Sequence, residues 1–352
     1  MDHGMNVLGP GTAFELSADV ERHLGYRPGA VRIFADTSAF SSIDRGDALE
    51  LGGRYYLVTG TVREEGLGLD EQPKYWVKRA VLCGSGAEKI VKLVFLEQFD
   101  LHFGESVVRC FRSPAKEARV LDRVRRHPQF MTGTSLRDRA GNNVRVIDVI
   151  PGPSLEHHVG NLPVGHEEYF HREVPALLWR FLPCLEGLRF LHEHGERHGD
   201  VRPDHIILDR NSGLLRWIDY DYDYDYPEAP FGLDILGAGH VLAFIVGQGV
   251  MDRRRLLREP GLARTLDRIG PGDHSVVDRR RVVNLGACFR YIPASLNRVL
   301  MHFSAGAEVF YERIAELAED LGEALSGMIA PAPGEVTWAC RARRRSGSWS
   351  SP

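Results

Sequence analysis

The hydrophobic residues of this chain change their spacing near its middle, at Pro151-Gly152-Pro153. Before this point, apolar positions form short runs rich in β-branched and aromatic residues, which is typical of strands. After it, they recur every three or four positions over long stretches, which is typical of helices. Because proline and glycine end regular elements, we place a hinge there. The pattern predicts a β-rich half and a helical half, and ligands are expected in the cleft between them.

The first half predicts several short strands and then a helix at 114–125. A glycine turn separates two of these strands, which indicates a hairpin. Residues 1–50 are mixed in character, and we expect an irregular extension with short helices. The expected strands are Tyr55–Val58, Tyr75–Val77 continued by Ala80–Leu82, Lys89–Phe95 and Val144–Ile150.

The second half predicts long helices. Leu233–Val246 is apolar all round, as in a fully buried helix, and Pro183 is expected to kink an earlier helix. Residues 331–352 lose all periodicity and are rich in arginine and serine, so we expect a disordered tail. The apolar positions with helical spacing are Val174, Leu177, Leu178, Phe181, Leu185, Leu188 and Leu191, and later Phe310, Ile314, Leu317 and Leu321.

Composition excludes several classes of protein. The 352 residues are 43% hydrophobic and 26% charged, which is ordinary for a globular chain able to bury a core without staples. A net charge of −4 gives no overall electrostatic attraction to nucleic acid or to a membrane surface. The five cysteines are scattered without a CxxC pair, so we expect neither a disulfide framework nor a zinc site. There is neither a secretory signal pattern nor a run long enough to span a bilayer, and we expect a cytoplasmic protein.

Two aspartates in the second half carry the chemistry. Asp200 lies in the loop His198-Gly199-Asp200, and Asp219 directly follows the apolar strand Leu214–Ile218. A short hairpin between them would bring both carboxylates to one place. Phosphoryl transfer needs one carboxylate to orient the attacking hydroxyl and another to hold magnesium on the phosphates.

This segment resembles the catalytic loop and the metal-binding motif of protein kinases, which read H-R-D-L-x-x-x-N and D-F-G. The resemblance implies a two-lobed α+β fold with a small β-rich N-lobe and a mainly helical C-lobe. It also implies that ATP and Mg²⁺ are bound, with Asp200 as the catalytic residue and Asp219 as the metal ligand. We expect the kinase-like domain at 51–330, with the N-lobe at about 51–150 and the C-lobe at about 151–330.

Lys92 and Glu117 match a further pair of kinase residues. Lys92 is the only charged residue between Ile90 and Phe95, and a lysine flanked by apolar residues needs an anionic partner. Glu117, on the helix that follows, is the expected partner, with Glu97 and Glu105 as weaker candidates. In kinases this ion pair contacts the nucleotide phosphates, so the resemblance makes both residues part of the ATP site.

Other family positions are occupied less regularly. Gly66 and Gly68 lie where kinases have a glycine-rich loop over the phosphates, but the third glycine is absent, and a plain turn is equally expected. Asp234 begins the buried helix and is expected to accept hydrogen bonds from the backbone near His198. His198 and Asp234 are therefore assigned a structural, supporting role, whereas Gly66 and Gly68 are assigned to ATP binding.

Three departures from the family pattern bear on activity. Gly199 replaces the arginine with which some kinases bind a phosphate on the activation loop. Control by phosphorylation of that loop is therefore not expected. His205 replaces a metal-binding asparagine, and imidazole suits magnesium poorly. Only 14 residues separate Asp219 from Asp234, too few for a long activation segment. Asp221, two residues after Asp219, would face the same side of an extended chain and is a further metal ligand candidate.

The sequence therefore predicts ATP-dependent phosphoryl transfer, with serine or threonine of a protein as the favoured acceptor. A small-molecule kinase of the aminoglycoside or choline type is the first alternative, because the short segment before Asp234 is also similar to those enzymes. A catalytically inactive nucleotide-binding scaffold is the second, because of His205. No nucleic-acid or membrane partner is expected.

Overall fold

The computed structural model describes residues 10–64, 72–103, 106–259 and 261–328. These residues form a mixed α+β structure with one large, mainly antiparallel sheet and several helices. The chain divides into two compact units. Unit 1 comprises 1–98, 111–126 and 131–150, and unit 2 comprises 99–110, 127–130 and 151–352.

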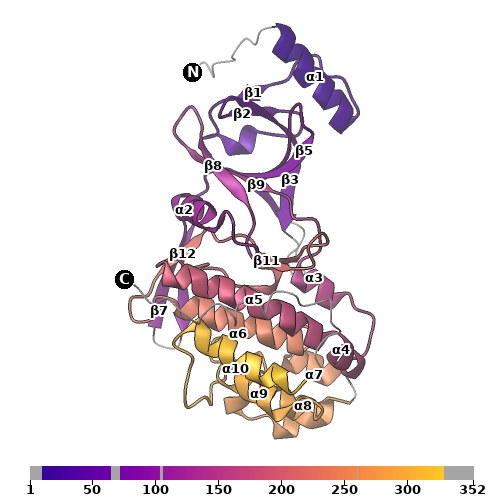
Figure 1. The fold of residues 1–352 in the computed structure, drawn as a ribbon, viewed down its shortest axis with the longest axis vertical. Helices are drawn as coiled ribbons and strands as arrows, with labels where there is room; N and C mark the ends of the chain where they lie inside the picture. The colour runs from indigo at the N-terminus through magenta and orange to yellow at the C-terminus, as the bar shows by residue number, and fades with distance from the viewer. Residues whose placement is uncertain (1–9, 65–71, 104–105, 260, 329–352) are drawn as a thin grey trace, which may run out of the picture. The chain divides into compact units, whose positions relative to one another are not determined.

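The sheet of unit 1 has the strand order β1-β2-β3-β4-β5-β9-β8 (Figure 1). β1 and β2 are parallel, and each of the other neighbouring pairs is antiparallel. The strands are β1 (Ile33–Phe34), β2 (Ala48–Leu51), β3 (Arg54–Glu64), β4 (Gln72–Leu82), β5 (Ala87–Lys92), β8 (Gly133–Arg137) and β9 (Asn143–Asp148).

Helix α2 (Pro114–Val124) packs against β8 and β9, and α1 (Pro10–Leu24) against β3. The strands predicted in this half are present, although β5 ends at Lys92 rather than Phe95 and β9 ends at Asp148 rather than Ile150. Residues 10–50 contain more order than the sequence indicated, since α1, a short 3₁₀ helix at Phe40–Ser42 and strand β1 fall there and strand β2 begins there. Ile43, Leu49 and Leu51 join the core of the sheet, which explains why this segment is ordered.

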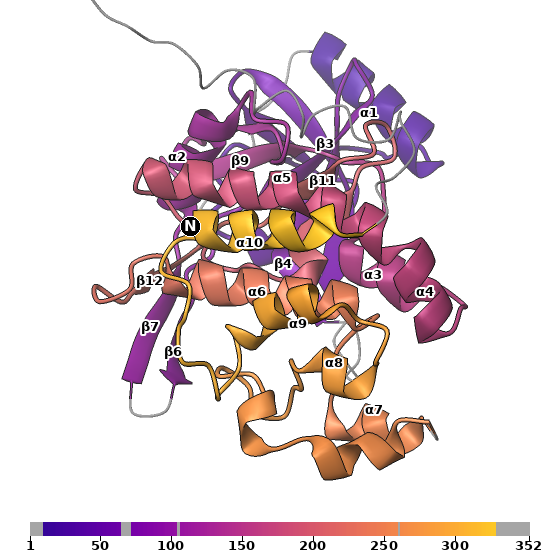
Figure 2. The same ribbon diagram turned by 60° about the horizontal axis from the view of Figure 1, so that its bottom comes forward.

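Unit 2 is mainly helical. Helix α5 contacts α10 and α6, and α9 contacts both α10 and α6 (Figure 2). Its helices are α3 (Leu155–Gly160), α4 (His166–Arg172), α5 (Val174–Glu193), α6 (Gly232–Val246), α7 (Arg253–Arg258), α8 (Leu285–Cys288), α9 (Ala294–Met301) and α10 (Ile314–Ser326), with short 3₁₀ helices at Pro203–His205, Ala263–Arg268 and Pro271–Asp273.

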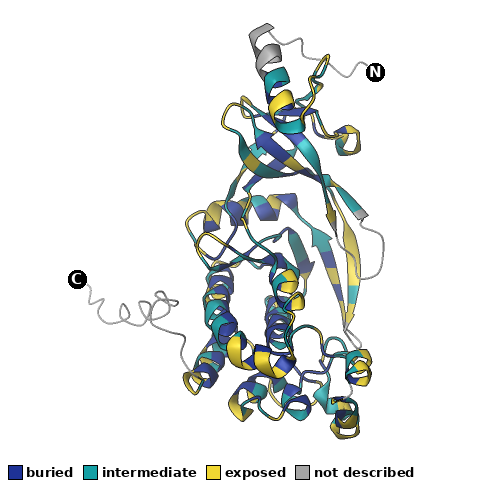
Figure 3. Cartoon of the chain, turned by 90° about the vertical axis from the view of Figure 1, so that its right-hand side faces the viewer, coloured by how far each residue is buried: buried dark blue, intermediate teal, exposed yellow. Residues whose placement is uncertain are grey.

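The predicted helical stripes are confirmed with one exception. All seven apolar positions expected on the helix from Val174 are buried, and the helix continues through Pro183. Phe310 is exposed and precedes α10, because that helix begins only at Ile314. In each unit the buried residues lie where elements face one another (Figure 3).

Two small sheets complete unit 2. Strands β10 (Ile206–Leu208) and β11 (Leu215–Trp217) form an antiparallel pair after the predicted catalytic loop. A second sheet has the order β12-β7-β6, with β6 at Gln98–Phe103, β7 at Ser106–Arg112 and β12 at Tyr222–Asp225. The residues of β6 and β7 were not assigned any element from the sequence.

Candidate functional site

Lys92 and Glu117 form a buried ion pair in unit 1. Lys92 Nζ lies 2.8 Å from Glu117 Oε1, and the two residues are 2% and 0% exposed. Ser113 caps helix α2 by accepting a hydrogen bond from the Lys116 amide, and Pro114 opens the helix, so Glu117 falls in its first turn. The two residues that the sequence paired are in contact.

Arg145 is a third member of this cluster, which sequence reasoning missed. Its Nε lies 2.9 Å from Glu117 Oε2, so the two carboxylate oxygens of Glu117 face two different cations. Arg145 is fully buried on β9. The signal that could have found it is the one that found Lys92, because Arg145 is the only charged residue in the run Val144–Ile147.

One of the two weaker candidate acids pairs with a different cation. Glu97 lies 3.2 Å from Arg112. Glu105 lies outside the described residues, as do Gly66 and Gly68 of the predicted phosphate-covering loop.

In unit 2, the loop from His198 to His205 is tied to helix α6 by Asp234. The Asp234 carboxylate accepts hydrogen bonds from the backbone amides of His198 at 2.6 Å and Gly199 at 2.8 Å, and it lies 3.0 Å from His192 Nε2. Burial opposes ionisation of this carboxyl, but its partners outweigh the burial and lower its pKa to about 2. Asp234 therefore stays ionised and holds the loop, as the sequence predicted for it.

Asp200 is held beside His205. His205 Nδ1 lies 2.9 Å from the Asp200 carbonyl oxygen and 3.4 Å from its Oδ2, while Arg202 Nε lies 3.8 Å from Oδ1. Burial raises the pKa of the Asp200 carboxyl, against the opposing charges of His205 and Arg202. A carboxylate with a raised pKa that is still partly accessible is suited to accept a proton from a hydroxyl.

The other ring nitrogen of His205, Nε2, lies near two more carboxylates. His205 Nε2 lies 3.8 Å from Asp204 Oδ2 and 3.8 Å from Asp219 Oδ2. Arg202 pairs with Asp204, and together with His205 it lowers the pKa of that carboxyl despite the opposing effect of burial. The sequence-predicted residues Asp200, His205 and Asp219 are thus brought together in unit 2.

Asp219 has a strained backbone. Its φ of 58° lies in the left-handed region, which a non-glycine residue adopts only when its surroundings hold it there. Such strain is found preferentially at functional sites. The expectation that Asp219 and Asp221 face the same side assumed an extended chain. The left-handed backbone at Asp219 interrupts that extended geometry. Asp221 is buried, whereas the Asp219 carboxylate is partly exposed.

The tyrosine-rich segment that follows Asp219 forms a strand. Residues 222–225 form β12, and Tyr224 packs with Val108 and Cys110 of β7. Arg197 lies over the Tyr224 ring at 4.3 Å and 2.8 Å from Asp223. Alternating tyrosines provide one apolar face, which a strand can bury.

Magnesium chemistry fits this arrangement in part. Mg²⁺ is usually held by one or two protein carboxylates together with phosphate oxygens, and Asp219 offers an accessible oxygen ligand. Among the described residues, no three histidine, cysteine, aspartate or glutamate side chains are arranged to bind a metal by themselves. A metal at Asp219 would therefore depend on a nucleotide for most of its ligands.

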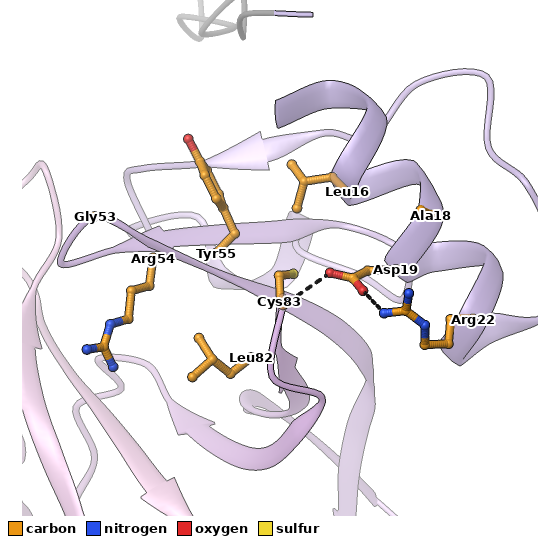
Figure 4. A pocket seen from close by; sticks show the side chains of 10 residues that line it. Leu16, Ala18, Asp19, Arg22, Gly53, Arg54, Tyr55, Leu82 and Cys83 are labelled. Atoms are coloured by element: carbon orange, nitrogen blue, oxygen red, sulfur yellow. Dashed lines mark hydrogen bonds and ion pairs between the residues drawn. The ribbon is translucent and has the colours of Figure 1, made fainter. Parts of the chain in front are cut away.

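An open pocket of about 640 Å³ lies elsewhere, between α1 and the ends of β3 and β4 (Figure 4). None of the predicted site residues lines it. Asp19 bonds Arg22 at 2.6 Å and the Gly84 amide at 3.1 Å, and it faces Cys83. Burial raises the pKa of the Cys83 thiol to about 11, so it is unsuited to act as a nucleophile. These contacts attach α1 to the sheet.

Comparison with known proteins gives a distant likeness to kinases. No family model matches the chain. Over 182 residues, the chain is 24% identical to the serine/threonine-protein kinase SSK22 of Saccharomyces cerevisiae. This aligned stretch covers 49% of this chain and 12% of that protein. A stretch of 39 residues is 49% identical to the MAP kinase kinase kinase SSK2 of the same yeast, covering 11% of this chain and 2% of that protein.

These matches indicate a kinase-like relationship at low identity. The chain spans only a small part of the length of either relative. Within the described ranges, no helix is both long and apolar enough to traverse a bilayer.

Proposed function

We propose that this chain catalyses ATP-dependent phosphoryl transfer to a hydroxyl group, with serine or threonine of a protein as the acceptor. The observation that carries the proposal is the buried Lys92–Glu117 ion pair between a strand and the first turn of the following helix. A buried ion pair is a poor source of stability, since desolvation offsets most of its attraction. A role in holding phosphates accounts better for its position.

The proposal assigns nucleotide phosphates to Lys92 and the remaining chemistry to the carboxylates of unit 2. Asp200 orients the acceptor hydroxyl and accepts its proton. Asp219 holds Mg²⁺, with Asp221 and His205 as candidates for further contacts. The bound ion would neutralise charge on the transferred phosphoryl group. Asp234 keeps the loop that carries Asp200 in place through His198 and Gly199.

Thermal stability with and without Mg²⁺ and ATP tests the nucleotide site. Saturating ATP should raise the melting temperature of the wild type by several degrees through mass action. Lys92→Met should abolish the shift. Lys89→Met is the matched control, because Lys89 lies on the same strand and pairs with Asp148 at 2.5 Å. Absence of any wild-type shift at millimolar ATP would contradict the proposal.

Two variants in unit 2 separate binding from transfer. Asp200→Ala should keep the ATP-induced stabilisation while transfer of labelled phosphate falls at least about 100-fold. Asp219→Ala should lose both transfer and the magnesium-dependent part of the stabilisation, since the metal contacts the nucleotide in the ground state. Transfer by Asp200→Ala at the wild-type rate would remove Asp200 from its assigned role.

A small-molecule acceptor is the second candidate. The observation that favours it is β12, which occupies four of the 14 residues between Asp219 and Asp234 within a sheet and leaves little chain for a peptide-docking segment. Parallel assays with a generic protein acceptor, an aminoglycoside and choline distinguish the two. ATP-induced stabilisation without transfer to any acceptor, or hydrolysis, would indicate an inactive scaffold instead.

A further inference from the structure

Glu117 is held by two buried cations from neighbouring strands. Lys92 on β5 and Arg145 on β9 are directly opposite each other in the antiparallel ladder. Directly opposite residues point to the same face of a sheet, with their Cβ atoms about 5 Å apart. Two like charges in such a pair destabilise the sheet unless an anion lies between them. Glu117 is that anion, with one oxygen toward each cation.

Displacing helix α2 would therefore disrupt two buried ion pairs together. Lys92 is 2% exposed and Arg145 is 0% exposed, so bulk water could not solvate either charge if Glu117 moved away. Removing one partner from a buried pair is strongly destabilising, because the remaining charge is left uncompensated. The helix is further attached to β9 by Asn143, whose Nδ2 lies 3.4 Å from the Pro114 carbonyl oxygen.

A purely structural role explains Arg145 less well. Its Nη1 donates to the carbonyl oxygens of Asn143 at 2.7 Å and Leu93 at 3.3 Å, which an arginine used only as a strand anchor would also do. However, its Nη2 is buried without a hydrogen-bond partner among the described residues. A buried, unsatisfied donor costs stability, and an apolar side chain like those of Val144 and Val146 would avoid that cost.

We propose that Arg145 is a positioning residue that holds Glu117 and helix α2 against the sheet whether or not nucleotide is bound. Lys92 then meets the phosphates with its partner already in place. As a consequence, displacement of α2 does not switch this chain between active and inactive states. The statement about phosphates rests on the proposed function, whereas the statement about α2 does not.

Hydrogen exchange of the full chain, free and with Mg²⁺ and ATP, tests the proposal. In the wild type, the amides of α2 should be equally protected in both states. In free Arg145→Met they should exchange at least about tenfold faster, because local opening no longer breaks the Arg145–Glu117 pair. Arg145→Lys retains a cation and should restore most of the protection.

Lys78→Met is the matched control. Lys78 is also a fully buried cation of the same sheet, but it donates to the Ile43 carbonyl oxygen at 2.6 Å and not to Glu117. This variant should leave α2 exchange within about twofold of the wild type even if global stability falls. Faster α2 exchange in Lys78→Met equal to that in Arg145→Met would overturn the proposal.

Kinetics provide the second readout. Arg145→Met should raise the KM for ATP about tenfold or more while kcat changes less. In this variant, part of the free energy of nucleotide binding is used to order Glu117. Unchanged KM and unchanged α2 exchange would overturn the positioning role. Unprotected α2 amides in the free wild type would do the same. If the wild type binds no ATP, the proposed function fails, and the exchange of the free variants still decides whether Arg145 holds α2.

Discussion

The carboxylate of Asp234 at the start of α6 accepts a 2.6 Å hydrogen bond from the backbone amide of His198, 36 residues earlier in the chain. Asp234 is fully buried and also bonds the Gly199 amide. Because Asp200 is the next residue along, one buried carboxylate on a helix sets the backbone geometry of the candidate catalytic loop.

Asp234→Asn should destabilise the protein by about 2–4 kcal/mol, since a side-chain amide loses the charge and one of its two acceptor oxygens. Denaturant unfolding at pH 7 measures this. Asp278→Asn is a useful control. The pKa of Asp278 is also lowered to about 2, chiefly by its hydrogen bond with Arg280, but this pair lies at the surface and is expected to contribute less than about 1 kcal/mol. An equal loss in both variants would contradict the role given to Asp234.

His205→Asn should increase the stabilisation by Mg²⁺ and ATP, and turnover with it. An asparagine can still bond the Asp200 carbonyl oxygen that His205 Nδ1 approaches at 2.9 Å, and it offers magnesium an oxygen ligand. His205→Ala should lose both contacts. If His205→Asn instead behaves like His205→Ala in melting and transfer assays, the imidazole has its own role in this loop.

His166 should make unit 2 sensitive to mild acid. Its ring stacks on Phe289 at 3.6 Å and lies 2.6 Å from the Tyr291 hydroxyl, and burial lowers its pKa from 6.5 to about 4. The unfolded chain therefore binds more protons than the folded one between pH 6.5 and 4, so stability falls as the pH falls through this window.

The contribution of His166 to this loss between pH 7.5 and pH 5 is about 2 kcal/mol. Urea unfolding of the wild type and His166→Gln at the two pH values should show a smaller difference for the variant. His240, whose burial also lowers its pKa to about 4, leaves a residual sensitivity in both proteins. An unchanged difference in His166→Gln would contradict the assignment.

Gly152→Ala should be strongly destabilising, although the residue lies in a connecting segment. A Cβ at this position would overlap the carbonyl oxygen of Leu208, and Pro153 and Pro151 accept backbone hydrogen bonds from Leu208 at 3.0 Å and Arg210 at 2.8 Å. A loss of about 2–4 kcal/mol is expected in thermal or denaturant unfolding.

Gly160→Ala is the matched control for Gly152→Ala. Gly160 ends helix α3, and a Cβ built on it would meet nothing within 4 Å apart from its chain neighbours and the backbone of its own helix. This change should be neutral or stabilising by up to about 1 kcal/mol. Similar stabilities for the two variants would show that the close approach to Leu208 does not constrain residue 152.

The sequence alone located the elements whose signals are local. Helical spacing identified the seven buried positions of α5, and an isolated lysine in an apolar strand identified Lys92 as a residue in need of an anion. Glu117 followed as its partner because helix α2 comes next among the elements expected from the sequence. The helical prediction succeeds because periodicity depends on neighbours within one or two turns of chain. The prediction for Lys92 succeeds because a lysine among apolar residues needs an anionic partner, whatever the distance to that partner in the sequence.

The tertiary structure decided the rest. Arg145 became a partner of Glu117 only through the register in which β5 and β9 pair, and spacing along the chain does not encode that register. The tyrosine-rich segment became β12 because β7 offered a strand edge and the apolar residues Val108 and Cys110. Strand pairing joins residues that are distant in sequence, and its energy comes from cross-strand contacts that no single segment contains.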